Sequence, residues 1–219
     1  MWWQEWMKAM EDHRNPDLAG PMEAYMRNRF PFLGIPKPRR MEISKPYRKS
    51  MRDAVEVDWD FVERCWVRPE REFQYMALGY LYQVKDRLHT EDLGRLGDYI
   101  TRKSWWDSVD QFPALLGDIL SREPKALRVL LDWSLAEDFW LRRAAILHQL
   151  LKKEKTDRAA LEKILSNNLG SKEFFINKAM GWALRDFSKT DPRWVADFLE
   201  SHTQGLSSLT RREGSKYLS

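Results

Sequence analysis

The sequence lacks the features that mark several common classes of protein. It has one cysteine, Cys65, so no internal disulfide can form, which suits the reducing cytoplasm where we expect the protein to act. No run of 18 apolar residues occurs, so we expect no transmembrane helix and no membrane partner. The four histidines follow no ligand spacing such as HExxH, and we expect neither a metal nor a cofactor; they are His13, His89, His148 and His202.

Strand-like alternation of apolar and polar residues is nearly absent as well. Apolar residues instead recur every three or four positions, which predicts an all-α fold. No low-complexity linker divides the chain, so we expect a single domain over residues 1–219 and a monomer. The predicted helices are 2–12, 18–29, 38–51, 58–67, 70–85, 91–102, 105–119, 124–134, 138–153, 157–168, 172–186, 192–202 and 207–217.

One break between these helices is unusually apolar. The residues from Phe30 to Ile35 are too apolar for a free linker, so we expect them to pack as a structured connection.

A repeat becomes visible when the predicted helices are aligned. Phe73, Trp106, Trp140 and Phe175 are spaced 33, 34 and 35 residues apart, each preceded by another helix. A helical hairpin repeating at this period is typical of an α-solenoid, and stacked hairpins of this kind form a curved array with a long concave binding face.

The repeat has one exception in its packing positions. Four residues after each aromatic residue stand Ala77, Asp110, Ala144 and Ala179, so one unit has a carboxylate where the others have a small apolar residue. Arg143 precedes one of these alanines, and Trp182 follows another by three. In successive units Asp110, Arg143 and Trp182 could line one side of the array.

The stretch Ser104–Asp110 combines two adjacent tryptophans with two carboxylates. If it is helical, with Ser104 as the N-cap, Trp106 and Asp110 share a face. An aromatic ring beside an ionised carboxylate is suited to holding a cation. The alternative is one core tryptophan, one exposed tryptophan and two solvated acids.

Charge is unevenly distributed although the net charge is only +4. Residues 27–52 contain nine basic residues against one acid, and residues 138–193 contain twelve against seven. Separated basic segments can converge on one surface that binds nucleic acid. Solvated helix faces are the alternative.

Four segments in order resemble the AlkD family of HEAT-like-repeat DNA glycosylases, and together they span nearly the whole chain. They are residues 25–35 (YMRNRFPFLGI), 103–110 (KSWWDSVD), 139–146 (FWLRRAAI) and 174–185 (FFINKAMGWALR).

This resemblance implies a repair enzyme that hydrolyses the N-glycosidic bond of cationic alkylated purines in duplex DNA, without a base-flipping pocket. It implies Asp110, Trp106 and Trp182 as the catalytic residues and Arg143 as a phosphate-binding residue, with Tyr25 near the lesion. We add Lys178, Arg185 and Arg142 to the predicted DNA-binding set.

The chemistry of the residues agrees with this expectation. Alkylation at N3 or N7 makes the purine cationic, so it can leave without a general acid. Asp110 can stabilise the oxocarbenium-like charge on the sugar and orient water, and the two indoles can present their π faces to it. No lysine stands at the position of Asp110, so strand cleavage through a Schiff base is not expected. The alternative function is a non-catalytic HEAT-like solenoid that binds DNA or protein.

Overall fold

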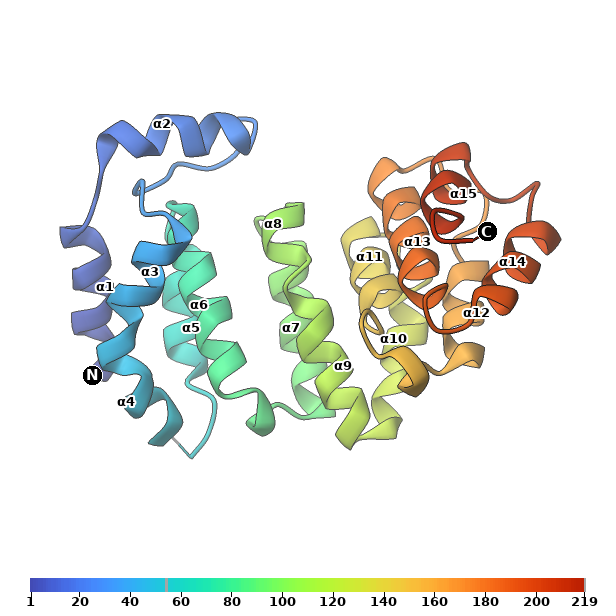
Figure 1. Ribbon diagram of the computed structural model, residues 1–219. Helices are drawn as coiled ribbons and strands as arrows, with labels where there is room; N and C mark the ends of the chain where they lie inside the picture. The colour runs from blue at the N-terminus through green and yellow to red at the C-terminus, as the bar shows by residue number, and fades with distance from the viewer. Residues whose placement is uncertain (54, 219) are drawn as a thin grey trace. The chain divides into compact units, whose positions relative to one another are not determined.

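The computed structural model describes residues 1–53 and 55–218, which form helices joined by turns and loops (Figure 1). No strand occurs among these residues, which confirms the all-α class. The α-helices are α1 (Trp2–Asp12), α2 (Pro16–Tyr25), α3 (Lys37–Ser44), α4 (Arg48–Asp53), α5 (Trp59–Val67), α6 (Arg71–Gln83), α7 (Leu93–Thr101), α8 (Trp106–Val109), α9 (Phe112–Arg122), α10 (Leu127–Trp133), α11 (Phe139–Leu147), α12 (Arg158–Ser166), α13 (Phe174–Phe187), α14 (Pro192–Ser201) and α15 (Ser208–Gly214). Short 3-10 helices lie at η1 (Lys45–Tyr47), η2 (Lys85–Arg87), η3 (Thr90–Asp92), η4 (Pro124–Ala126) and η5 (Lys153–Lys155).

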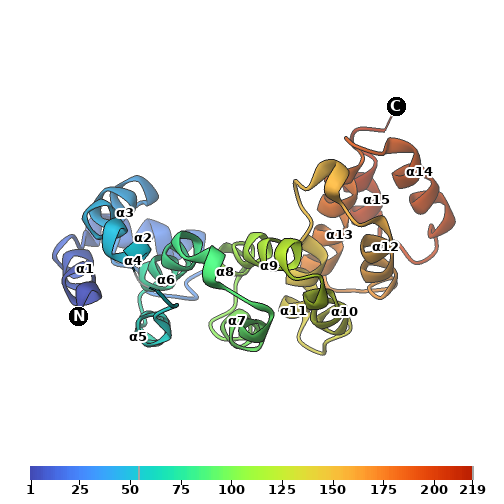
Figure 2. The ribbon, with the colours of Figure 1, turned by 90° about the horizontal axis from the view of Figure 1, so that it is seen from below.

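The chain packs as two compact units, Met1–Leu88 and His89–Ser219, which we call the N-terminal and C-terminal units. In the C-terminal unit, α13 packs against both α11 and α15 (Figures 1 and 2). The single domain expected over residues 1–219 and the concave face expected for the array stay predictions. No helix among the described residues is long and apolar enough to cross a membrane.

Aspartate side chains begin several of these helices. Asp58 accepts a hydrogen bond of 2.9 Å from the N–H of Phe61 at the start of α5, and Asp157 and Asp191 cap α12 and α14 in the same way. Each cap satisfies a backbone N–H that has no partner within the helix. These helices therefore begin within one residue of the predicted positions.

The apolar connection after α2 is ordered by one buried carboxylate. Glu72 on α6 is 0% exposed and accepts hydrogen bonds from the N–H groups of Leu33, Gly34 and Ile35 at 2.9–3.0 Å. Gly34 has φ +82°, and a Cβ at this position would lie 2.0 Å from the backbone oxygen of Asn15. The structured connection predicted from the sequence is confirmed, and only glycine fits where it turns.

The repeat of about 34 residues is confirmed in the side-chain contacts of the C-terminal unit. Hydrogen bonds join equivalent positions of successive hairpins at sequence separations of 33 to 35. Examples are Thr90 with Glu123, Asp110 with Arg143, Ser134 with Asn167, Asn177 with Thr210, and Lys178 with Glu213.

The continuous helix predicted over 105–119 is wrong. The chain instead forms α8, turns at residues 110 and 111, and begins α9 at Phe112. Pro113 has no N–H to donate to the carbonyl of Val109, and its ring would clash with that carbonyl in a continuous helix. Ser104 does not cap α8, since its hydroxyl donates 2.7 Å to the carbonyl of Ile100.

Three other predicted helices end early or divide. α2 ends at Tyr25 because Arg27 and Asn28 adopt left-handed backbone angles, with φ of 56° and 54°. α11 ends at Leu147 before a turn in which Leu151 has φ 65° and donates its N–H to Asp186. The helix predicted over 38–51 divides into α3, η1 and α4. Left-handed turns end helices without requiring glycine when side chains satisfy the freed backbone groups.

Candidate functional site in the C-terminal unit

The two adjacent tryptophans of the WWD stretch have different environments. Trp105 is 6% exposed, and its ring centroid lies 5.2 Å from that of Phe175 and 6.0 Å from that of Trp140. Trp106, the first residue of α8, is only half-buried. One tryptophan thus builds an aromatic cluster inside the unit while its neighbour reaches the surface.

Asp110 lies at the C-terminal end of α8, where its N–H donates 3.0 Å to the carbonyl of Trp106. Its side chain is 21% exposed, so part of it reaches solvent. The break that Pro113 imposes after α8 ends the helix at this residue, and the carboxylate is therefore held on a short, well-defined turn.

Arg143 on α11 binds this carboxylate through both of its oxygens. Its Nε donates 2.7 Å to Asp110 Oδ1 and its Nη2 donates 2.7 Å to Oδ2, while its Nη1 donates 2.6 Å to the backbone oxygen of Phe175. The Arg143 side chain is only 1% exposed. A forked arginine–carboxylate pair of this kind fixes the plane of the carboxylate as well as its position.

The two members of this ion pair differ in burial. The cation lies inside the unit, and the carboxylate is the end that reaches solvent. The phosphate contact expected of Arg143 stays a prediction, but each nitrogen of its guanidinium group already donates to a protein acceptor.

Trp182 on α13 lies against the same arginine. The guanidinium carbon of Arg143 is 5.1 Å from the indole centroid of Trp182, and Nζ of Lys178 is 5.7 Å from it. The half-buried indole thus contacts two cations of the unit. Asp110, Arg143 and Trp182 therefore meet in space as their positions in the repeat predicted.

Glu213 on α15 joins two of the predicted DNA-binding residues. It accepts 2.8 Å from Lys178 and 2.5 Å from Arg185, both of which are less than one-third exposed. The hydrogen bond from Lys178, the largest lowering influence, and the neighbouring charges hold the pKa of Glu213 below its usual value. α15 approaches α13 closely here, since a Cβ on Gly181 would lie 2.6 Å from Cβ of Glu213.

Sequence reasoning missed Glu213, although a signal was present. It stands 35 residues after Lys178, which is the spacing at which equivalent positions of successive hairpins meet. A search for opposite charges at the repeat spacing would have found it.

Two other predicted site residues, Arg142 and Tyr25, and the second carboxylate of the WWD stretch, Asp107, differ in their exposure. Arg142 on α11 is half-buried, and its Nε is buried without a hydrogen-bond partner among the described residues. Asp107 is half-buried on α8. Tyr25 ends α2 in the N-terminal unit and is 71% exposed.

No group of three or more histidine, cysteine, aspartate or glutamate side chains among the described residues could hold a metal ion.

Comparison with known proteins gives the chain a family. The sequence model of the DNA alkylation repair enzyme family matches residues 6–218. The chain belongs to this family. The resemblance drawn from the four sequence segments is thereby confirmed at the level of DNA alkylation repair.

A solved structure agrees with this assignment. It is described as a predicted DNA alkylation repair enzyme from Enterococcus faecalis, and it is 37% identical to this family member with a TM-score of 0.88. The similarity covers 94% of this chain and 97% of that one. No curated protein sequence matches the chain.

Proposed function

We propose that this protein is a monofunctional DNA glycosylase that hydrolyses the N-glycosidic bond of cationic alkylated purines, such as N3-methyladenine and N7-methylguanine, in duplex DNA. It leaves an abasic site and requires neither a metal nor a cofactor. Membership of the DNA alkylation repair enzyme family supports the repair of alkylation damage, and the geometry around Asp110 supports the reaction type.

The observation behind this proposal is the Asp110–Arg143 ion pair, in which the arginine is buried and the carboxylate side chain is partly exposed. A carboxylate that is fixed in orientation by a buried arginine and partly open to solvent suits a reaction in which positive charge develops on a sugar. Since Arg143 is already hydrogen-bonded to Asp110, the carboxylate needs no rearrangement as that charge develops. Preorganisation of this kind is a major source of catalysis.

The leaving group accounts for the lack of a dedicated acid in this mechanism. A purine alkylated at N3 or N7 departs as a neutral base, so it needs no proton from the protein. Asp110 stabilises the oxocarbenium-like sugar and orients the attacking water. The exposed side of Trp106 adds a π face beside it, worth about 0.5–2 kcal/mol.

Trp182 has a second role in this proposal besides facing the substrate. Its ring lies against Arg143, so it supports the residue that orients Asp110. We therefore describe Arg143 as a positioning residue, and Asp110, Trp106 and Trp182 as the groups that face the reacting sugar and base.

DNA binding is proposed to use Lys178, Arg185, Arg142 and Tyr25, whereas the phosphate contact expected of Arg143 is replaced by its buried hydrogen bonds to Asp110. Lys178 and Arg185 share Glu213 in the protein without DNA, so phosphate groups would compete with that carboxylate for them. The partner is duplex DNA containing alkylated purines, bound by a cytoplasmic monomer.

Incubation with N-methylated duplex DNA, followed by chromatography of the released bases, tests the proposal. We expect free N3-methyladenine and N7-methylguanine, with the DNA strand left intact until the abasic site is cleaved by alkali. If the duplex is bound and no base is released, the non-catalytic solenoid becomes the better description.

A further inference from the structure

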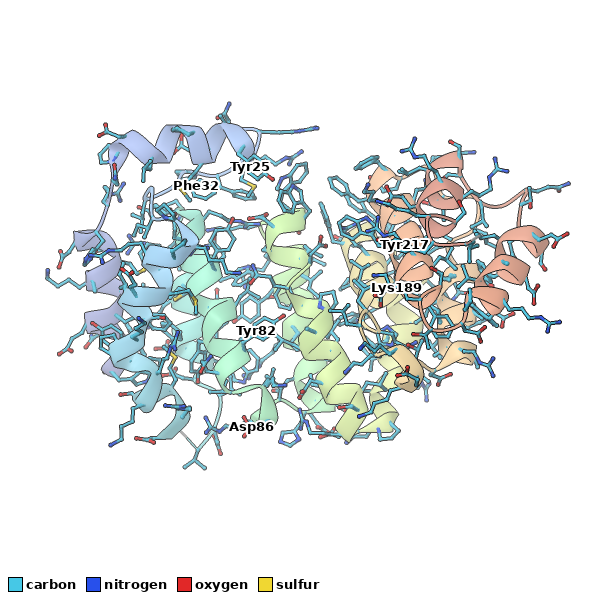
Figure 3. The ribbon with its side chains drawn as sticks, viewed as in Figure 1. Tyr25, Phe32, Tyr82, Asp86, Lys189 and Tyr217 are labelled. Atoms are coloured by element: carbon cyan, nitrogen blue, oxygen red, sulfur yellow. The ribbon has the colours of Figure 1, made fainter. Side chains whose placement is uncertain are left out.

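The N-terminal unit contains a hollow that the mechanism above does not use. Its volume is about 340 Å³, and residues of α2, of the connection after it, of α3 and of α6 line it. We call it the Tyr75 hollow, and its lining consists of Leu18, Pro21, Met22, Tyr25, Met26, Phe32, Pro36, Arg40 and Tyr75. Figure 3 labels two of these side chains, Tyr25 at the end of α2 and Phe32 on the connection that follows it.

The lining is aromatic and apolar, with a single charged residue. The rings of Phe32 and Tyr75 lie 6.4 Å apart at an angle of 50°, and Tyr25 stands at the rim with 71% of its surface exposed. Two methionines, which adapt to flat ligands of varied outline, complete the walls. Such a surface suits a planar ring system that stacks.

Arg40 determines the charge of the ligand that fits. Its guanidinium carbon lies 4.4 Å from the ring centroid of Tyr75, and its Nη1 donates 2.9 Å to the backbone oxygen of Ile35. No aspartate or glutamate is among the lining residues. A cation fixed in an apolar wall repels a cationic ligand and tolerates an uncharged π system.

The segment that supplies Phe32, Pro36 and Arg40 to the hollow is basic, which favours a ligand attached to phosphate. The segment of residues 27–52, which begins just after Tyr25 and includes Arg40, contains nine basic residues and one acid. Stacking rings combined with basic residues are the usual elements of a site for unpaired nucleotides. A volume near the lower end of the range for ligand sites suits one base rather than a longer segment.

We propose that the Tyr75 hollow binds one unpaired, uncharged nucleobase of the DNA substrate by stacking. The inference rests on the proposed function, because it takes duplex DNA as the substrate. It adds to that function a second site, which binds a base other than the lesion. The cationic purine is processed at Asp110, whereas the Tyr75 hollow receives a base that has lost its pairing partner and excludes the cationic lesion itself.

The first test uses duplexes that contain 2-aminopurine, either as a single-base bulge or paired with thymine. We expect the bulged duplex to bind about tenfold more tightly and the 2-aminopurine emission to be quenched by stacking, since each stacked base contributes about five- to a hundredfold in affinity. Equal binding of the two duplexes, without quenching, would overturn the inference.

Variants locate the effect in this hollow. Tyr25→Ala should remove most of the preference for the bulged duplex, and Tyr25→Phe should retain it because the ring is kept. Tyr25 is so exposed that either variant should fold, which thermal unfolding would verify. Tyr217→Ala is the matched control: Tyr217 is also exposed, at 53%, but it lies in the C-terminal unit against Lys189 (Figure 3). Loss of the preference in Tyr217→Ala, or its persistence in Tyr25→Ala, would contradict the assignment.

A second probe tests the charge. A bulged adenine should bind several-fold more tightly than a bulged 1-methyladenine, which is cationic at neutral pH. Equal or tighter binding of the cation would overturn the uncharged assignment.

Base release from methylated duplex DNA is measured in parallel. Release without any preference for bulges rejects the hollow and leaves the glycosylase standing. A preference for bulges without release leaves the stacking site standing and rejects the glycosylase.

Discussion

Arg143 donates two parallel hydrogen bonds of 2.7 Å to Asp110, which stands 33 residues earlier in the sequence. Of the two side chains, only that of Asp110 has appreciable exposure. Asp110 is therefore the member of the pair that is oriented by two hydrogen bonds and is also accessible to a substrate. The catalytic proposal can therefore be tested by changing the charge of one residue and the shape of the other.

Asp110→Asn should reduce the rate of base release by about 10²–10³, because the amide keeps the size of the side chain but cannot stabilise developing positive charge. Single-turnover release of N7-methylguanine measures the rate, and binding to undamaged duplex should change little. The variant leaves Arg143 buried beside a neutral partner, so its thermal unfolding must be recorded as well. Release at the wild-type rate by a folded variant would transfer the catalytic role away from Asp110, with Asp107 next to be tested.

Arg143→Lys separates the charge of Arg143 from its geometry. Lysine retains the positive charge but cannot form the two parallel hydrogen bonds, so we expect release to slow about 10- to 100-fold as Asp110 loses its fixed plane. The salt dependence of duplex binding should stay the same because the number of cations is unchanged. A variant that releases bases at the wild-type rate would show that the paired hydrogen bonds are not needed.

Glu213→Gln should strengthen DNA binding. The substitution removes the carboxylate shared by Lys178 and Arg185, so both cations become available to phosphate and the slope of log K against log salt should steepen by about 1–2 units. The stability cost should stay below about 1 kcal/mol, since these ion pairs are partly exposed. Glu200→Gln, at an exposed position on α14, makes the same change in net charge and serves as the control. An equal effect of the two substitutions would mean that only net charge matters.

His148 should make folding stability depend on pH. It is 2% exposed, its Nδ1 lies 2.6 Å from the backbone oxygen of Ala145, and burial, the largest cause, lowers its pKa from 6.5 to about 4. Between pH 6.5 and 4 the unfolded chain therefore binds a proton at His148 that the folded chain does not bind. The free energy of unfolding falls by about 3 kcal/mol as the pH drops through this window.

Urea titrations at several pH values would measure this dependence. His148→Leu should flatten it between pH 6.5 and 4.5, above the range where carboxylates of lowered pKa such as Glu213 begin to protonate. His13→Gln, at an exposed position, is the control and should keep the wild-type slope. An unchanged slope in His148→Leu would show that another group takes up the proton.

The repeat accounts for what could be predicted from the sequence. Alignment at about 34 residues brought Asp110, Arg143 and Trp182 to one side of successive hairpins, and the structure confirms that Arg143 contacts the other two. The alignment did not reveal that Pro113 divides the predicted helix over 105–119 and leaves Asp110 at the end of α8.

Other features could not be predicted because they depend on three-dimensional packing. The resemblance implied that Arg143 binds phosphate, but its burial follows from how α11 packs against α13. The Tyr75 hollow forms where α2, the connection held by Glu72, α3 and α6 meet, and no periodicity in the sequence describes such a junction.

The selectivity of the enzyme should follow the charge of the lesion more than its shape. In the proposed mechanism Asp110 stabilises positive charge, and the indoles of Trp106 and Trp182 do so more weakly. A neutral base lacks that charge and leaves poorly without a general acid. We therefore expect release of N3-methyladenine and N7-methylguanine from duplex DNA, with uracil and hypoxanthine left in place.

Trp106→Ala and Trp182→Ala should each slow this release by about five- to thirtyfold, as expected if an indole contributes 1–2 kcal/mol. Trp182 also lies against Arg143 and Lys178, so its loss should lower the unfolding temperature as well. Chromatographic assay of all four lesions with each variant measures both charge selectivity and rate. Efficient excision of uracil or hypoxanthine, with either tryptophan dispensable, would contradict charge recognition and favour a pocket that selects the base by its shape.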